Sequence, residues 1–149
     1  MLPQGTRIAR REDLEYALSQ DNDFLRENYT DFGLALRTAG DSYEPNDLLA
    51  KRLANQLEKR DIALKTGKLI PLDALSLIDE ENSEYGVVID LKEESESSIR
   101  DLNDFKWDYA REEGLSHADF YWVRGWLWDS DGGRLAGSDG GGRVVVVSA

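Results

Sequence analysis

The sequence predicts an α+β protein in which an N-terminal three-helix segment packs on a small, mainly antiparallel sheet, with one further acidic amphipathic helix. Two observations carry this prediction. Apolar residues recur at helical spacing through residues 11–66, and runs rich in β-branched and aromatic residues follow later. Helices first and strands later favour α+β over an alternating parallel sheet. The length of 149 residues predicts a single domain, 1–149, with a helical part at about 11–66 and a mixed part at about 69–149.

The three N-terminal helices are expected near residues 14–18, 23–39 and 45–66. Both longer helices carry an apolar stripe at helical spacing and are followed by a glycine, which is typical of a helix end. The stripe of the second helix consists of Phe24, Leu25, Tyr29, Phe32, Leu36 and Ala39. The stripe of the third helix consists of Leu49, Leu53, Leu57 and Leu64.

The later part of the chain is expected to hold the strands and the acidic helix. Strands are predicted at residues 85–91, 120–128 and 143–148, where β-branched and aromatic side chains gather. The acidic helix is predicted over residues 97–113 and ends at Gly114.

Negative charge is the strongest compositional signal. Thirty acidic residues against eighteen basic ones leave a net charge of −12. Residues 79–113 alone contain thirteen acids and four bases, a net of −9. On the predicted helix over 97–113, four acids spaced by three, four and four residues form one stripe. These acids are Asp101, Asp104, Asp108 and Glu112.

The stripe predicts a non-enzymatic interaction protein that binds a basic protein surface, as an inhibitor, a neutraliser or a regulatory subunit. The alternative is that the acids form an ordinary solvated helix face. The same charge disfavours direct binding to nucleic acid or to anionic lipid.

One face of the third predicted helix is basic, whereas the 79–113 segment is acidic. Lys51, Arg52, Asn55 and Lys59 share the side of the third helix away from its leucines. This face is expected to be solvated or attracted to acids of the same chain or of a second copy, so a homo-oligomer is a rival to an external partner. A nucleic-acid-contacting helix is a further alternative, which the overall charge opposes.

The aromatic strand over 120–128 is a second candidate contact surface. If it is one strand, Trp122, Arg124 and Trp126 point the same way, and Trp and Arg are frequent at binding hot spots. Core packing is the alternative for these aromatic residues. The sequence therefore adds these three residues to the candidate partner-binding set.

The region after the aromatic strand resembles a cation-binding loop only loosely. An EF-hand loop beginning at Asp129 needs Gly at its sixth and Glu at its twelfth position, where the chain has Arg134 and Gly140. No metal site and no cofactor are predicted, and Asp129, Asp131 and Asp139 are the candidates for a looser site. The alternative function is a small-ligand or metal-binding module that uses residues 120–128 and 129–142.

No catalytic motif is recognised, and the protein is predicted not to be an enzyme. His117 is the only histidine, and it is expected at a turn with Ser116 and Asp119, where a capping or exposed role is commonest. The chain contains no cysteine, which removes thiol catalysis and disulfide frameworks. It has no apolar run of the ~18 residues that cross a bilayer. A cytoplasmic location without membrane contact is expected.

Overall fold

The computed structural model describes residues 4–25, 29–39, 44–79, 87–122, 126–132, 142–143 and 145–148. These residues form two α-helices, α1 (Arg11–Gln20) and α2 (Glu44–Glu58). The longer strands are β2 (Tyr29–Leu36), β3 (Lys68–Pro71), β4 (Leu75–Asp79), β5 (Val87–Leu91), β8 (Leu115–Trp122) and β9 (Trp126–Gly132). The short strands are β1 (Thr6–Ile8), β6 (Arg100–Asp101), β7 (Tyr109–Ala110), β10 (Gly142–Arg143) and β11 (Val146–Ser148). Three 3-10 turns are η1 (Leu72–Ala74), η2 (Glu96–Ser98) and η3 (Leu102–Asp104).

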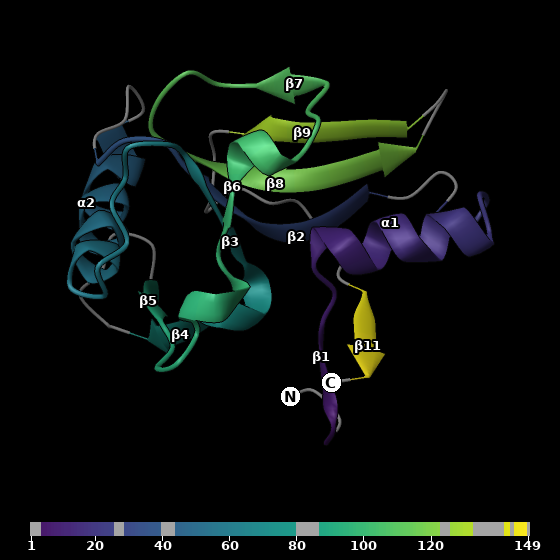
Figure 1. Cartoon of the computed structure of the whole chain (residues 1–149), viewed down its shortest axis with the longest axis horizontal. Helices are drawn as coiled ribbons and strands as arrows, with labels where there is room; N and C mark the ends of the chain where they lie inside the picture. Colours follow the sequence, from purple (N-terminus) through teal and green to yellow (C-terminus); the bar gives the residue numbers. More distant parts are fainter. Residues whose placement is uncertain are drawn as a thin grey trace.

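The central sheet has the strand order β6-β3-β2-β8-β9-β7, and β10 also pairs with β2. Its pairs are antiparallel except for β7 with β9 and β10 with β2, which are parallel. Strands β4 and β5 form a separate hairpin, and β1 pairs with β11 in a ribbon that extends away from the sheet (Figure 1). The sheet is therefore mixed.

Residues 102–108 form a strap across one face of the sheet. Strands β6 and β7 lie at opposite ends of the strand order, yet only the strap separates them in sequence. Leu102, Phe105 and Trp107 of the strap pack on the core, and the Trp107 ring stacks on Phe32 of β2 at 6.0 Å between centroids. In Figure 1 the chain runs from η3 past β9 to β7. The strap thus links the two edges of the sheet.

Each face of the sheet carries its own core. On one face, α1 and the strap pack against Phe32, Phe120 and Trp128. On the other face, α2 and the β4–β5 hairpin pack against side chains of β2, β3 and β8. That second core includes Leu34, Leu36, Leu53, Leu57, Ile70 and Leu115. The sheet is therefore a middle layer, and residues that alternate along its strands belong to different cores.

The expected three-helix segment is wrong, although the chain is α+β in the broad sense. The predicted second helix, 23–39, contains strand β2 instead. A Cβ atom added at Gly33 would lie 2.6 Å from the backbone oxygen of Ile70 on β3, so glycine permits the close approach of these strands. Tertiary packing on both faces of Tyr29–Leu36 has overridden an apolar pattern that also fits a helix.

The predicted acidic helix over 97–113 is wrong as well. The segment contains η2, β6, the strap and β7. Phe105 and Trp107 alternate with the exposed residues Asp104, Lys106 and Asp108, which is the two-residue period of extended chain. A helix would have placed Trp107 apart from Phe105, so burial of both rings requires the extended form.

Other elements agree with the sequence or refine it. The first predicted helix is α1, and the third is α2, which ends at Glu58 rather than near residue 66. The predicted strand over 85–91 is β5, and the predicted strand over 120–128 is parts of two strands, β8 and β9. None of the helices in the described part of the chain is both long and apolar enough to cross a membrane.

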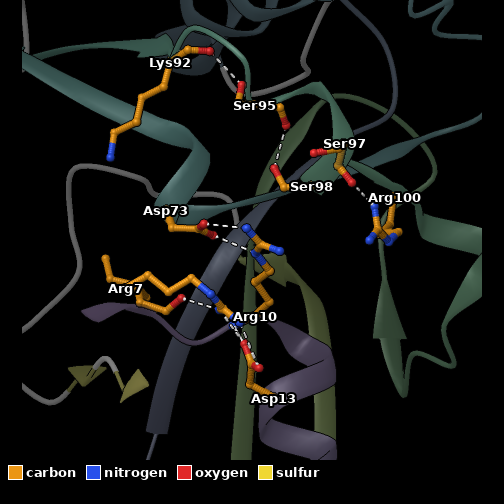
Figure 2. A network of polar contacts seen from close by, with 10 residues as sticks. Arg7, Arg10, Asp13, Asp73, Lys92, Ser95, Ser97, Ser98 and Arg100 are labelled. Atoms are coloured by element: carbon orange, nitrogen blue, oxygen red, sulfur yellow. Dashed lines mark hydrogen bonds and ion pairs between the residues drawn. The ribbon is translucent and has the colours of Figure 1, made fainter. Parts of the chain in front are cut away.

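Polar contacts hold α1 and the 92–100 segment in place (Figure 2). Asp13 accepts hydrogen bonds from the Arg10 backbone at 2.8 Å and from the Arg7 guanidinium at 2.6 Å, which satisfies the start of α1. Arg10 in turn pairs with Asp73 of η1 at 2.8 Å. Within the 92–100 segment, the Ser95 and Ser98 hydroxyls donate to backbone carbonyls three residues earlier. These contacts fix the chain that leads into the strap.

Candidate functional site

The four acids of the predicted stripe lie along the strap and its flanks rather than on one helix. Asp104, Asp108 and Glu112 are exposed, while Asp101 in β6 is half-buried. Asp104 and Asp108 belong to the alternating positions that face away from Phe105 and Trp107. Asp108 also accepts a hydrogen bond from the Trp128 backbone at 2.8 Å, which ties the strap to β9.

In the described part of the 79–113 segment, Asp90, Glu96 and Asp101 are paired with bases of the same chain. Arg52 of α2 binds Asp90 of β5, with Nη2 3.0 Å from Oδ2. Two further pairs follow, Arg60 with Glu96 at 3.2 Å and Lys68 with Asp101. The hydrogen bond from Lys68 lowers the pKa of Asp101, and that from Thr66 acts in the same direction. Of the predicted basic face, Arg52 is thus paired with an acid of the same molecule.

The predicted aromatic contact residues separate into two strands. Trp122 on β8 lies directly opposite Trp126 on β9, and Phe120 lies opposite Trp128. Trp126 is 42% exposed, whereas Phe120 and Trp128 are buried. Arg124, the cation that the sequence places among these rings, lies outside the described residues.

Another cation occupies the aromatic core. The Arg11 guanidinium carbon lies 4.0, 4.6 and 5.0 Å from the ring centres of Trp128, Trp107 and Phe105. Arg11 is 2% exposed, and its Nε donates to Glu15 at 2.9 Å. Burial lowers the pKa of Arg11, and the pairing with Glu15 opposes this change. The strap aromatics are thus anchored to α1 by a cation–π contact.

A carboxyl–histidine cluster lies on the same face of the sheet as α2. It is near the opposite end of that face. One ligand atom each from Asp31, His117 and Asp119 lies within 4.8 Å of the others. Asp31 of β2 is directly opposite Asp119 of β8, so both side chains point to the same face. The strand registers shift between Asp31 and Gly33 and between His117 and Asp119, so β-bulges lie at the same level as the cluster.

The chemistry of the cluster is set by the burial of Asp119. This side chain is 1% exposed, and its Oδ2 accepts a hydrogen bond from the Tyr29 hydroxyl at 2.9 Å. Among the described residues, no hydrogen-bond partner is found for Asp119 Oδ1 or for Asp31 Oδ1. Burial raises the pKa of Asp119 to about 9, and the nearby Asp31 carboxyl acts in the same direction. Burial also raises the pKa of Tyr29.

Of the acids predicted as looser metal candidates, Asp129 lies beside this cluster. Asp129 on β9 is directly opposite Asp119, so Asp31, Asp119 and Asp129 form a row across three strands. Burial raises the pKa of Asp129, while its oxygen Oδ1 accepts the Asp131 backbone N–H at 2.7 Å. Asp131 is exposed, and Asp139 lies outside the described residues.

Sequence reasoning missed the cluster for two reasons. His117 and Asp119 were expected at a turn, but they are alternate residues of β8 and so share a face. That His-x-Asp spacing was the one signal available. Asp31 belonged to a predicted helix, and nothing in its local sequence places it beside Asp119, eighty-eight residues later.

Comparison of the chain with protein-family models, with curated proteins and with solved structures gives no match in any of the three cases. The function is therefore inferred from the described residues of this chain.

Proposed function

We propose that this is a non-enzymatic protein of the cytoplasm that binds a basic protein surface, as an inhibitor, a neutraliser or a regulatory subunit. The observation that supports this proposal is the exposure of Asp104, Asp108 and Glu112 along the strap and just after it. The binding surface consists of these three side chains.

The strap presents its acids from a fixed backbone. Leu102 is buried, and Phe105 and Trp107 pack on the core, so the intervening Asp104 is held between anchored residues. Charges on a preorganised segment lose less conformational entropy on binding than charges on a free loop. Opposite charge on a partner would then raise the association rate and contribute specificity.

The internal ion pairs favour an external partner over a second copy. Arg52, Arg60 and Lys68 are already engaged by acids of the same chain. By contrast, no ion pair joins Asp104 or Glu112 to a base among the described residues. The bases that a second copy would offer are thus partly used, whereas strap acids remain for a different protein.

The test compares two variants of equal charge. The strap variant, Asp104→Lys/Glu112→Lys, reverses one acid of the strap and one just after it, and Glu58→Lys/Glu93→Lys reverses two exposed acids elsewhere. A partner captured from the source cells with the wild-type protein is identified, purified and titrated calorimetrically against all three proteins at two salt concentrations. We expect the strap variant alone to bind at least ~10-fold more weakly and with a smaller salt dependence. Equal loss in both variants, or loss in neither, would refute the strap as the binding surface.

A further inference from the structure

We propose that Asp31, His117 and Asp119 bind one divalent transition-metal ion on the sheet. The cluster brings two carboxylates and an imidazole together, with one ligand atom of each within 4.8 Å of the others. Two atoms that bind one ion at about 2.1 Å each lie at most about 4.2 Å apart. Side-chain adjustments of less than about 1 Å would therefore bring all three atoms into a common coordination sphere.

The second observation is an orphaned oxygen in a buried residue. Asp119 is 1% exposed, yet within the part of the chain that the structure describes, neither its Oδ1 nor Oδ1 of the facing Asp31 has a hydrogen-bond partner. Buried carboxylate oxygens are normally paired, because leaving one unpaired costs roughly 1–3 kcal/mol or more for a charged group. A cation between Asp31 and Asp119 would satisfy both oxygens and offset the repulsion between the two carboxylates.

A proton shared by the two carboxyls is the rival occupant. A shared proton would also satisfy the facing oxygens, but it would not require a third group beside the two carboxyls. His117 lies on the same sheet face, next to Asp119 in the alternation of β8, and supplies the nitrogen that a transition-metal site uses. The presence of the imidazole with both carboxylates favours the metal.

Tyr29 positions the ligand without touching the ion. Its hydroxyl donates to Asp119 Oδ2 at 2.9 Å, which holds the carboxylate plane and leaves Oδ1 for coordination. The Tyr29 ring is itself held against Tyr121, with centroids 4.5 Å apart. Hydrogen bonds of this kind orient metal ligands in many proteins.

The strands make the site rigid and also leave a way in. The ligands come from adjacent strands of the central sheet, and the register shifts beside Asp31 and Asp119 aim them together. Asp31 and His117 are only half-buried, so an ion would enter past them. One nitrogen and two oxygen ligands suit Zn²⁺ better than Ca²⁺ or Mg²⁺, and three protein ligands leave a position for water.

The test uses the fact that His117 is the only histidine in the chain. Protein treated with EDTA is titrated with Zn²⁺ at about 0.15 M salt, where exposed acids are largely screened. Long-range ¹H–¹⁵N spectra then report on a single imidazole. We expect its nitrogen resonances to move with saturation at one Zn²⁺ per chain, measured by dialysis and mass spectrometry of the metal. Unchanged imidazole resonances, with or without Zn²⁺ uptake elsewhere, would overturn the proposal.

Variants separate this cluster from the neighbouring acids. Asp31→Asn, His117→Gln and Asp119→Asn are each expected to abolish the saturable site. Asp131→Asn removes an exposed carboxylate from β9 and is expected to leave the dissociation constant within about twofold of wild type. Binding that survives Asp119→Asn, or that is lost only in Asp131→Asn, would contradict the assigned ligands. The wild-type imidazole spectrum decides the question even where a variant fails to fold.

Discussion

The guanidinium carbon of Arg11 lies 4.0 Å from the ring centre of Trp128, and this contact joins α1 to strand β9 within the aromatic core. Trp107 of the strap lies on the same cation at 4.6 Å. One side chain therefore connects a helix, a sheet strand and the strap, so its loss affects three elements at once.

Arg11→Ala should lower the free energy of unfolding by about 2–4 kcal/mol, because it removes a packed stem and the cation that contacts three rings. Chemical denaturation followed by tryptophan fluorescence measures the change. Tyr16→Ala is the matched control on the same helix, since Tyr16 is 69% exposed, and it should change stability by less than about 0.5 kcal/mol. A similar loss in both variants would contradict a specific contribution of the Arg11 contacts to stability.

Gly33→Ala should destabilise the protein more than Gly67→Ala. A Cβ at Gly33 would lie 2.6 Å from the backbone oxygen of Ile70, so two strands would have to separate. A Cβ at Gly67 would lie 2.6 Å from a terminal methyl of Leu102, which can rotate away. We expect a loss of roughly 2 kcal/mol or more at position 33 and about half of that at position 67. Equal melting temperatures for the two variants would contradict the close approach of β2 and β3.

Asp90→Asn should destabilise the protein at neutral pH but not in acid. The hydrogen bond from Arg52 lowers the pKa of Asp90, and that from Gln56 adds to it. Because the pKa of Asp90 is lower in the folded protein than the value of about 3.9 in the unfolded chain, the carboxylate contributes stability at pH values above about 3.9. This stability is lost as the pH falls through the pKa of Asp90 in the folded protein.

The Asp90 effect is small because the Arg52 side chain is 43% exposed. We expect a difference from wild type of about 0.5–1 kcal/mol at pH 7 that shrinks towards zero below about pH 4. Urea denaturation of both proteins at several pH values measures it. A difference that persists unchanged in acid would mean that the asparagine acts through packing rather than through lost charge.

Tyr29→Phe should weaken Zn²⁺ binding by about 10-fold while leaving one site per chain, if the cluster holds the metal as proposed. The substitution removes only the hydroxyl that donates to Asp119 Oδ2. Isothermal titration gives the affinity and the stoichiometry together. Tyr109→Phe is the control, because Tyr109 is 56% exposed and lies on β7 at the edge of the sheet. Unaltered affinity in Tyr29→Phe would remove Tyr29 from a positioning role.

The sequence predicted elements whose pattern is local and missed those set by distant contacts. Leu53 and Leu57 gave α2 correctly, because a helix buries residues at its own spacing. Strand β2 was misread, since Phe32 and Leu36 fit a helical stripe as well as a strand. Pairing with β3 and β8, including the close approach of Ile70 to Gly33, favours the strand over the helix.

The candidate sites likewise combine features that a local sequence pattern predicts with features that depend on distant contacts. The exposure of Asp104 followed from its charge, but its setting on an extended strap depends on the burial of Phe105 and Trp107 together. The Asp31–Asp119 pair depends on the register of β2 against β8, which no local pattern encodes.

The strap also affects how readily two molecules of this protein can associate through the edges of their sheets. Because residues 102–108 bridge the sheet, its terminal strands β6 and β7 are each only two residues long. A long flat edge would offer a row of open backbone donors and acceptors to which another chain can add a strand, and very short edge strands are one way that proteins avoid this. By ending the sheet in two-residue strands beside exposed carboxylates, the strap protects a strand-rich chain against edge-to-edge aggregation.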